Sequence, residues 1–454
     1  MSMAAGAQSV RENLMMRLDE ARRVSDELFG IVRPEALYER PIGERHRILF
    51  YLGHLEAFDW NLLTATLFDA PSLDPTLDKL FASGIDPVGG GLPNDQPSDW
   101  PSVERVQQYN RRLREMIDQR LARELSFTQS FRRERGSATS SAALANDPGL
   151  ILNVAIEHRL MHAETLAYMF HWLPVQKKIP QAASLSLPLT QPVIRQTIPI
   201  PAGTATLGLA RNSAFGWDNE FEQHAVSVPA FAVDRFKVTN AQFLEFVRAD
   251  GYSERAFWHD VDWEWKEKGA LRHPKFWSER DGPWRFRTMF GEVPLPADCP
   301  VYVSHAEAKA YARWAGKSLP TEAQWHRAAY GTPDGREREF PWGNQPPAAQ
   351  RGNFGYKRWD PAPVSAHPTG DSAFGVADLL GNGWEWTSTR FAPFPGFDAF
   401  PFYPGYSANF FEGQHYVMKG GSMRTAACML RRSFRNWFQP HYPHIYSGFR
   451  CVEN

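Results

Sequence analysis

Two histidines four residues apart, and a third one far upstream, are the residues of this chain best suited to chemistry. A helix would place His158 and His162 on one face, because positions i and i+4 are neighbours. His54 lies in a mostly apolar segment, where its ring nitrogens need a partner that a metal ion or a hydrogen bond would supply. Three imidazoles leave coordination positions open, as metal-based catalysis requires. The alternative is that these are unrelated histidines, since the spacing alone is a common pattern.

The elements that must position these histidines are predicted to be helices. Apolar residues recur at helical spacing in the first of them, residues 9–29, at Leu14, Leu18, Ala21, Val24 and Leu28. Further helices are predicted near 44–67, 102–125 and 147–173, with a Gly- and Pro-rich loop at 83–93. Four long amphipathic segments predict a four-helix bundle, in which His54 and the His158/His162 pair meet in the core or at one end.

The composition of the chain changes after the fourth predicted helix. Residues 175–197 are rich in Lys, Pro, Ser, Ala and Gln without a helical period and are interpreted as a linker. Beyond them, short strands and irregular loops dominate, with two clear helices, one from Thr239–Asn240 and one from Ser304 to about Ala315. The prediction is therefore a multidomain α and α+β protein, with a helical domain at 1–174, the linker at 175–197 and an irregular α+β domain at 198–454.

Composition and charge exclude several classes of function. A length of 454 residues predicts two or three domains, and a net charge of −1 without a long basic run argues against nucleic-acid binding. We expect no membrane association, because no apolar stretch is long enough to span a bilayer and residues 1–23 lack the apolar core of a signal peptide. Cys299, Cys428 and Cys451 are few and lack CxxC spacing, which favours a cytoplasmic location. No pattern defines an oligomeric state.

The second half of the chain resembles the formylglycine-generating-enzyme/sulfatase-modifying domain, which has a C-type-lectin-like fold. Five sequence words in the family order carry the resemblance: Lys237-Val238-Thr239-Asn240-Ala241-Gln242-Phe243, Leu319-Pro320-Thr321-Glu322-Ala323-Gln324-Trp325, Gly381-Asn382-Gly383-Trp384-Glu385-Trp386, Gly420-Gly421-Ser422 and Ser447-Gly448-Phe449-Arg450. Trp325, Trp384 and Trp386 are expected in the core. The active-site cysteine pair of that family is missing, since Cys428 stands alone, and formylglycine generation is disfavoured.

The first half resembles the DinB-like bundle. With a lone histidine on the second helix and His158-x3-His162-x-Glu164 on the fourth, the whole chain resembles the ergothioneine-type sulfoxide synthases. That resemblance implies that His54, His158 and His162 bind Fe(II) and that O2 is a co-substrate. It also implies an oxidoreductase that joins sulfur or selenium to imidazole C2 of hercynine, the trimethylated betaine of histidine. Neutral imidazoles suit Fe(II), and three of them leave three positions of an octahedral ion open.

The resemblance also assigns residues to hercynine. Asn436 matches the residue expected to bind its carboxylate, and Trp437 and Phe438 are candidates for holding its trimethylammonium group by their aromatic faces. Core packing is the alternative for both rings. Met161 fills a position where some relatives carry Gln that contacts the same carboxylate.

Two departures from the family pattern indicate which sulfur or selenium donor the chain can bind. Mycobacterial-type relatives bind γ-glutamylcysteine through an Asp and an Arg at positions that correspond to Phe438 and Tyr442, and through arginines in the loop after the second helix. Between Pro71 and Glu104 this chain has no Arg and only one Lys, Lys79. A donor with two extra carboxylates would lack its charged partners. Free cysteine or a neutral selenosugar is favoured instead, and the glycine-rich loop, which carries no Lys or Arg, favours the selenosugar-using selenoneine synthases.

Candidates for a proton donor lie in the second domain. Some relatives use a tyrosine at the position that corresponds to Phe400, and Tyr403 or Tyr406 would substitute for it, unless both are packing residues. Two other functions remain open at this point. One is a DinB-type thiol transferase that uses another divalent metal without O2, and the other is a lectin-like module that only binds a ligand.

Overall fold

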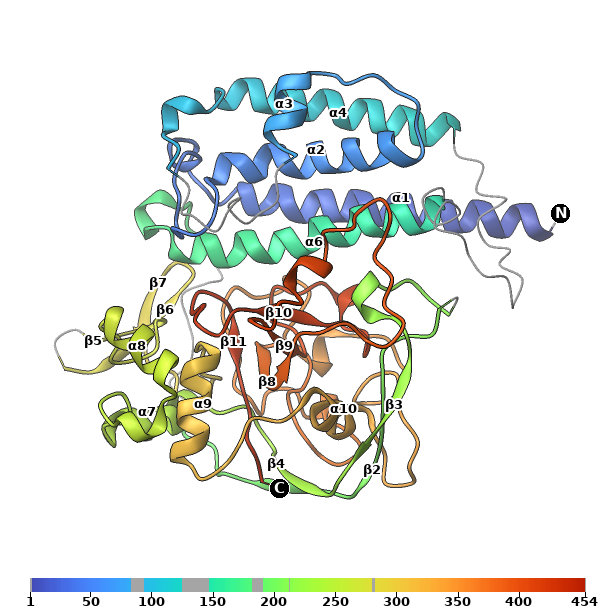
Figure 1. Cartoon of the computed structure of the whole chain (residues 1–454). Coiled ribbons are helices and arrows are strands. Elements are labelled where there is room, and N and C mark those ends of the chain that lie inside the picture. Colours follow the sequence, from blue (N-terminus) through green and yellow to red (C-terminus); the bar gives the residue numbers. More distant parts are fainter. Residues whose placement is uncertain are drawn as a thin grey trace. The chain divides into compact units, whose positions relative to one another are not determined.

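The computed structural model (Figure 1) describes residues 2–82, 94–124, 147–181, 191–211, 213–279 and 282–453. The chain divides into two compact units. The first unit comprises Met1–Gln181 and Ala399–Tyr406, and the second comprises Ala182–Asp398 and Ser407–Asn454. The predicted glycine-rich loop at 83–93 and part of the predicted linker, 182–190, lie outside the described residues.

Four long helices build the first unit: α1 (Ser2–Phe29), α2 (Ile48–Thr66), α4 (Val103–Glu124) and α6 (Pro148–Trp172). Helix α6 packs against α1 and α2, and α4 packs against α2. The predicted apolar face of α1, from Leu14 to Leu28, is buried. The predicted helical bundle is therefore confirmed.

Side-chain caps fix where the bundle helices begin. Asp147 accepts hydrogen bonds from the backbone N–H groups of Gly149 (2.9 Å) and Leu150 (3.2 Å) at the start of α6. Before α4, the Ser102 hydroxyl accepts one from the N–H of Arg105 (3.3 Å), so it caps the helix without a capping box. A short helix, α3 (Pro75–Leu80), lies between α2 and α4. The cap at Asp147 sets the start of α6, which carries His158 and His162, whereas α2 begins without a side-chain cap.

The described strands of the second unit form four small sheets. The largest has the order β10-β9-β8-β11, and the others are β1-β4-β12, β5-β6-β7 and β2-β3. The strands are β1 (Thr197–Ile200), β2 (Gly203–Leu207), β3 (His224–Val228), β4 (Phe231–Asp234), β5 (Trp277–Glu279), β6 (Trp284–Thr288), β7 (Gly291–Pro294), β8 (Trp384–Arg390), β9 (Tyr416–Lys419), β10 (Asn436–Phe438), β11 (Ser447–Gly448) and β12 (Val452–Glu453). All pairs are antiparallel except β8 with β11.

The second unit also contains helices that the sequence analysis missed. The two predicted ones are α7 (Asn240–Arg248) and α9 (His305–Trp314), and α8 (Asp260–Lys268) and α10 (Glu322–Tyr330) are additional. Helix α10 packs against β2, β3, β8 and β9, and its Trp325 is buried, as are Trp384 and Trp386. These three tryptophans are core residues, as predicted, and the mixed α and β fold class is confirmed.

The turn before β8 shows why one family motif is needed for the fold. Asn382 has a left-handed backbone (φ 65°), a conformation in which asparagine is tolerated better than most residues. Its buried carboxamide donates to Ala362 O (2.9 Å) and to Asp378 Oδ2 (3.0 Å), and accepts from Asn353 Nδ2 (3.1 Å). This side chain therefore joins the turn to Ala362 and Asn353, which lie 20 and 29 residues earlier in the sequence.

Residues 399–406 correct the predicted organisation at one point. The sequence analysis placed them in the second domain, but they cluster with the helical unit. The physical reason is aromatic packing, because the ring of Tyr403 lies 5.4 Å from that of Phe58 on α2. A loop from the second half of the chain therefore becomes part of the first unit. Among the described helices, none combines the length and apolarity needed to cross a bilayer.

Candidate metal centre

The three predicted histidines come together inside the first unit. Helix α6 presents His158 and His162 on one face, and α2 presents His54 toward them. Each residue offers a ring nitrogen, and these nitrogens all lie within 4.8 Å of one another. The Nε2 atoms of His158 and His162 are 3.1 Å apart, and the three side chains are almost fully buried, with exposed fractions of 3%, 3% and 6%. The cluster predicted from spacing is therefore present in space.

The hydrogen bonds of the three rings leave nitrogens available for a cation. His54 Nδ1 lies 2.7 Å from the carbonyl oxygen of Phe81, so this nitrogen carries the proton and Nε2 keeps its lone pair. Among the described residues, His54 Nε2 has no hydrogen-bond partner, and the Nε2 atoms of His158 and His162 face each other at 3.1 Å. Buried polar atoms without partners are costly, and a metal ion would satisfy the cluster. The donor set, three imidazole nitrogens, fits a divalent transition metal such as Fe(II).

Burial keeps these imidazoles in the form that binds metals. Desolvation lowers the pKa of His54 to about 4, against the opposing effect of the Phe81 carbonyl. Desolvation, reinforced by the neighbouring histidines, lowers the pKa values of His158 and His162 well below the ordinary range. All three rings are therefore neutral at pH 7, and the neutral ring is the ligand form.

Aromatic side chains surround the three imidazoles. Phe58 stacks on His158, with ring centroids 3.4 Å apart and an interplanar angle of 12°. Phe50 stacks on His54 at 4.9 Å, and the Tyr51 ring lies 5.8 Å from that of His162. Phe50 and Phe58 are four residues before and after His54 on α2, so the helical period places them on its face. These rings fix the imidazoles and exclude water from this side of the cluster.

The structure places the two predicted tyrosines next to this cluster. The Tyr403 ring is 6.3 Å from His158 and 5.7 Å from Tyr406. The Tyr406 hydroxyl donates to Met161 Sδ at 3.5 Å, so Met161 and Tyr406 are in contact. Phe400 is buried and stacks on Phe402. Tyrosine side chains therefore lie near the histidines, although Phe400 itself carries no hydroxyl group.

The other predicted substrate residues lie on β10 of the second unit. The Asn436 Oδ1 atom accepts a hydrogen bond from the backbone N–H of Trp437 (2.8 Å), and the carboxamide NH2 is the donor end of the side chain. The Trp437 indole stacks on Phe391 at 4.2 Å and 6°, and Phe438 stacks on Tyr442 at 5.3 Å. All three β10 residues are only half-buried, so they are not ordinary core positions.

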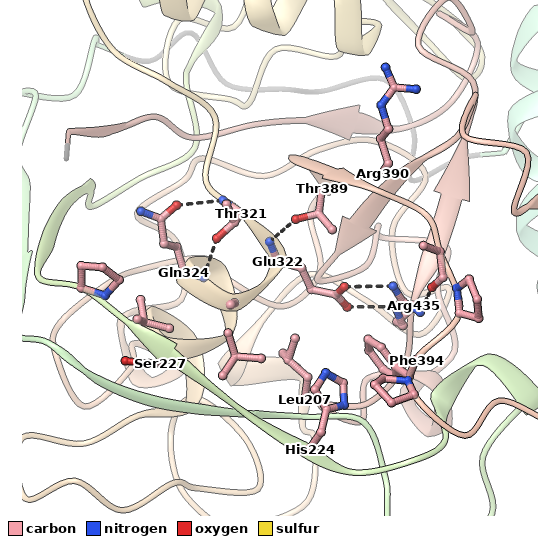
Figure 2. Close-up of a pocket in the computed structure, with 17 residues that line it drawn as sticks. Leu207, His224, Ser227, Thr321, Glu322, Gln324, Thr389, Arg390, Phe394 and Arg435 are labelled. Carbon is pink, nitrogen blue, oxygen red and sulfur yellow. Dashed lines mark hydrogen bonds and ion pairs between the residues drawn. The ribbon is translucent and has the colours of Figure 1, made fainter.

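A cavity of about 640 Å³ opens in the second unit, lined by β2, β3, the start of α10 and residues 389–395 (Figure 2). Glu322 and Arg435 form a bidentate ion pair there, at 3.0 and 3.1 Å, and Thr389 Oγ1 accepts from the Glu322 N–H. Because this buried pair neutralises itself, the cavity offers mainly apolar side chains. None of the residues predicted to bind metal or substrate lines it in the described chain. This cavity was not predicted from the sequence, although one of the family motifs, residues 319–325, contributes to it.

Comparison with known proteins identifies two families along the chain. Residues 17–166 match the DinB superfamily, and residues 184–454 match the Sulfatase-modifying factor enzyme 1-like domain. The Hercynine oxygenase of Mycolicibacterium smegmatis is 39% identical over 68% of this chain and 72% of that protein. The Hercynine oxygenase of Mycolicibacterium thermoresistibile is 44% identical over 52% of the chain, and the Ergothioneine biosynthesis protein 1 of Neurospora crassa is 28% identical over 92%. The matched parts span about half the length of these last two relatives.

The fold and the site thus define a class of protein, a DinB-type bundle with a three-histidine cluster joined to a sulfatase-modifying-factor domain. With these domains and these relatives, the chain belongs to the ergothioneine-type sulfoxide synthase family, which is a family of enzymes. The sequence-based resemblance is confirmed at this level.

Proposed function

We propose that this enzyme uses O2 to join a sulfur or selenium atom to imidazole C2 of hercynine. In one turnover the C2–H bond and the S–H or Se–H bond break. A C–S or C–Se bond forms, together with a bond between the chalcogen and one oxygen atom. O2 accepts four electrons, and its second oxygen atom leaves as water. This reaction class is the one that the family and the buried histidine cluster support together.

The single observation that carries the proposal is the convergence of His54, His158 and His162, whose ring nitrogens lie within 4.8 Å of one another. These residues would hold Fe(II), and the bound iron would supply the activation of O2 that an unreactive imidazole carbon needs. The stacked rings of Phe50 and Phe58 keep the imidazoles oriented. Their apolar surface also limits the access of water to the cluster.

Hercynine carries a carboxylate and a trimethylammonium group, and β10 offers a complementary partner for each. The Asn436 side chain accepts from the Trp437 N–H through Oδ1, and its carboxamide NH2 would donate to the carboxylate. The trimethylammonium group cannot donate ordinary hydrogen bonds, so the half-buried rings of Trp437 and Phe438 would hold it by cation–π attraction. Met161, which has no acidic or amide group, would leave the carboxylate contact to Asn436.

A tyrosine hydroxyl would hold the proton that the reduced oxygen needs. Tyr403 is the favoured donor because its ring lies within 6.3 Å of His158 and is only half-buried. Tyr406, whose hydroxyl donates to Met161 Sδ and whose ring lies 5.7 Å from that of Tyr403, would position both residues.

The donor that we propose is a neutral selenosugar, with free cysteine as the alternative. At the two positions where the resemblance places an Asp and an Arg for γ-glutamylcysteine, Phe438 and Tyr442 stack on each other at 5.3 Å and 16°. Without an Asp and an Arg at these positions, a donor with extra carboxylates would lack its charged partners. The glycine-rich loop at 83–93, which also favours a sugar, lies outside the described residues. A selenosugar donor would make this enzyme a selenoneine synthase.

The decisive experiment is anaerobic reconstitution with Fe(II), followed by hercynine, O2 and one donor per reaction. Cysteine, γ-glutamylcysteine and a reduced selenosugar would be compared, with products and rates read by mass spectrometry. We expect a selenium adduct to form fastest. If cysteine reacts fastest, the donor is a thiol and not a selenosugar. If γ-glutamylcysteine reacts fastest, the argument from Phe438 and Tyr442 is refuted. If no donor gives an adduct, hercynine is refuted as the acceptor.

A pair of histidine variants tests the metal centre itself. His158→Ala should lose bound iron and all activity, because two imidazoles cannot hold the ion as three do. His273→Ala removes a half-buried histidine of the second unit and serves as the matched control, with iron content and activity retained. Full activity in His158→Ala would overturn the assignment.

A further inference from the structure

A buried arginine lies directly beside the histidine cluster. Arg159 follows His158 on α6, and its side chain has an exposed fraction of 0%. Its guanidinium donates to Glu56 Oε1 and Oε2, both at 2.9 Å, and to Asp59 Oδ2 at 2.6 Å. It also donates to the carbonyl oxygen of Leu55 at 3.0 Å. Four hydrogen bonds thus run from one side chain of α6 to a single stretch of α2.

The position of this bridge along α2 is what matters for the site. The acceptors Leu55, Glu56 and Asp59 come one, two and five residues after His54 in the sequence. The guanidinium is planar and rigid, so several simultaneous hydrogen bonds fix the distance, the register and the rotation of α2 relative to α6. Because α2 carries His54 and α6 carries His158 and His162, the geometry of the cluster depends on these three quantities.

Other charged groups extend the network to the remaining helices. Arg114 of α4 donates to Glu56 Oε1 (2.6 and 2.9 Å) and to the carboxylate of Asp26 on α1 (2.7 Å). Arg159 also reaches the Ser25 hydroxyl on α1 at 3.3 Å. Arg114 thus shares the acceptor Glu56 with Arg159 but lies on a helix that carries none of the three histidines.

We propose that Arg159 is a positioning residue that sets His54 at the correct place against His158 and His162, an inference that rests on the proposed metal centre. General stability is a poor explanation for this group, because a buried ion-pair network contributes little beyond what well-packed apolar residues would contribute. Its geometric consequence is specific, since Arg159 joins the two helices that carry the ligands. Partners of this kind typically change metal affinity by 10–100-fold when removed.

The test compares Arg159→Met with Arg114→Met in the full-length protein. Co(II) is titrated anaerobically, and its dissociation constant is read from the ligand-field absorption with a competing chelator. We expect Arg159→Met to weaken Co(II) binding by about 10–100-fold and to shift the absorption bands, whereas Arg114→Met stays within about threefold of the wild type. Arg159→Lys, which keeps the charge but not the planar fork, should lie between them.

The outcomes separate this inference from the proposed function. Absence of Co(II) binding by the wild-type protein would overturn the metal centre and the inference together. Wild-type affinity in Arg159→Met, or equal losses in Arg159→Met and Arg114→Met, would overturn the inference alone. Far-UV circular dichroism and thermal unfolding without metal show whether each variant is folded. If Arg159→Met does not fold, Asp59→Asn is used instead, because it removes the charge of one acceptor of Arg159. This variant should still weaken Co(II) binding about tenfold or more. Wild-type Co(II) affinity in Asp59→Asn would refute the positioning role of Arg159.

Discussion

Gly53, the residue before His54, should be required for metal binding although it holds no ligand. A Cβ added at this position would lie 2.4–2.6 Å from three ring atoms of Phe81, closer than real Cβ contacts. The Phe81 ring is fully buried and packs against Phe50, Trp100 and Tyr109, at centroid distances of 6.1–6.4 Å. It therefore has no free space into which to move, and Gly53→Ala must displace Phe81 or α2.

The consequence for the site follows from the backbone of Phe81. Its carbonyl oxygen accepts the hydrogen bond from His54 Nδ1 at 2.7 Å, and this bond fixes the tautomer and the orientation of the ligand ring. Overpacking costs about 1–3 kcal/mol, and replacing glycine by alanine in a helix offsets about 1 kcal/mol of that. We therefore expect a net loss of up to about 2 kcal/mol in stability. No such compensation exists for metal affinity, which should fall by about 10–100-fold.

The assay measures Co(II) affinity and metal-free thermal unfolding for Gly53→Ala and two companions. Gly43→Ala is the control, because nothing lies within 4 Å of its added Cβ. The double variant Gly53→Ala/Phe81→Leu makes room for the methyl group and should recover part of the affinity. Wild-type affinity in Gly53→Ala, or no recovery in the double variant, would refute the steric reasoning.

Three further predictions address catalysis, binding and stability. Tyr403→Phe should lower kcat by about 100-fold or more while Co(II) affinity stays within threefold, since a general acid contributes about that much; an unchanged kcat would show that Tyr403 is a packing residue. Trp437→Ala should raise KM for hercynine by about 2–30-fold, the worth of a cation–π contact, and an unchanged KM in steady-state kinetics would remove it from the betaine site. Burial lowers the pKa of Lys419 to about 8 from its ordinary 10.5. The unfolded chain therefore binds more protons than the folded one between pH 8 and 10.5, and the contribution of Lys419 to stability rises with pH by on the order of 3 kcal/mol in that window. In urea unfolding, the free energy of unfolding of the wild type minus that of Lys419→Met should rise from pH 7 to pH 10. A constant difference would contradict the burial of a charged amine.

The structure also explains how two halves of one sequence contribute to a single unit. Residues 399–406 follow many strands of the second unit, yet Tyr403 packs against Phe58 and Tyr406 contacts Met161. The first unit therefore combines the histidines with hydroxyl groups from a distant loop. Such an arrangement allows the loop to vary while the histidine cluster stays on rigid helices.

The sequence by itself determined the features that depend on local periodicity. The four-residue spacing of His158 and His162 implied a shared helix face, and the apolar period from Leu14 to Leu28 implied the buried side of α1. The family motifs also carried the identity of both domains. Helix α10 could also have been predicted from the sequence, because Thr321 and Gln324 form a capping box of the same kind as those that begin α7 and α9.

Only the tertiary structure decided the contacts between residues far apart in the chain. The hydrogen bond from His54 to the Phe81 carbonyl, the four bonds from Arg159 to α2 and the approach of Tyr403 to His158 join positions separated by 27 to 245 residues. No local period encodes such pairs, because they depend on the register and rotation of packed helices and on the path of loops. The sequence thus supplied the ligand residues, and long-range packing supplied their distances and their hydrogen-bond partners.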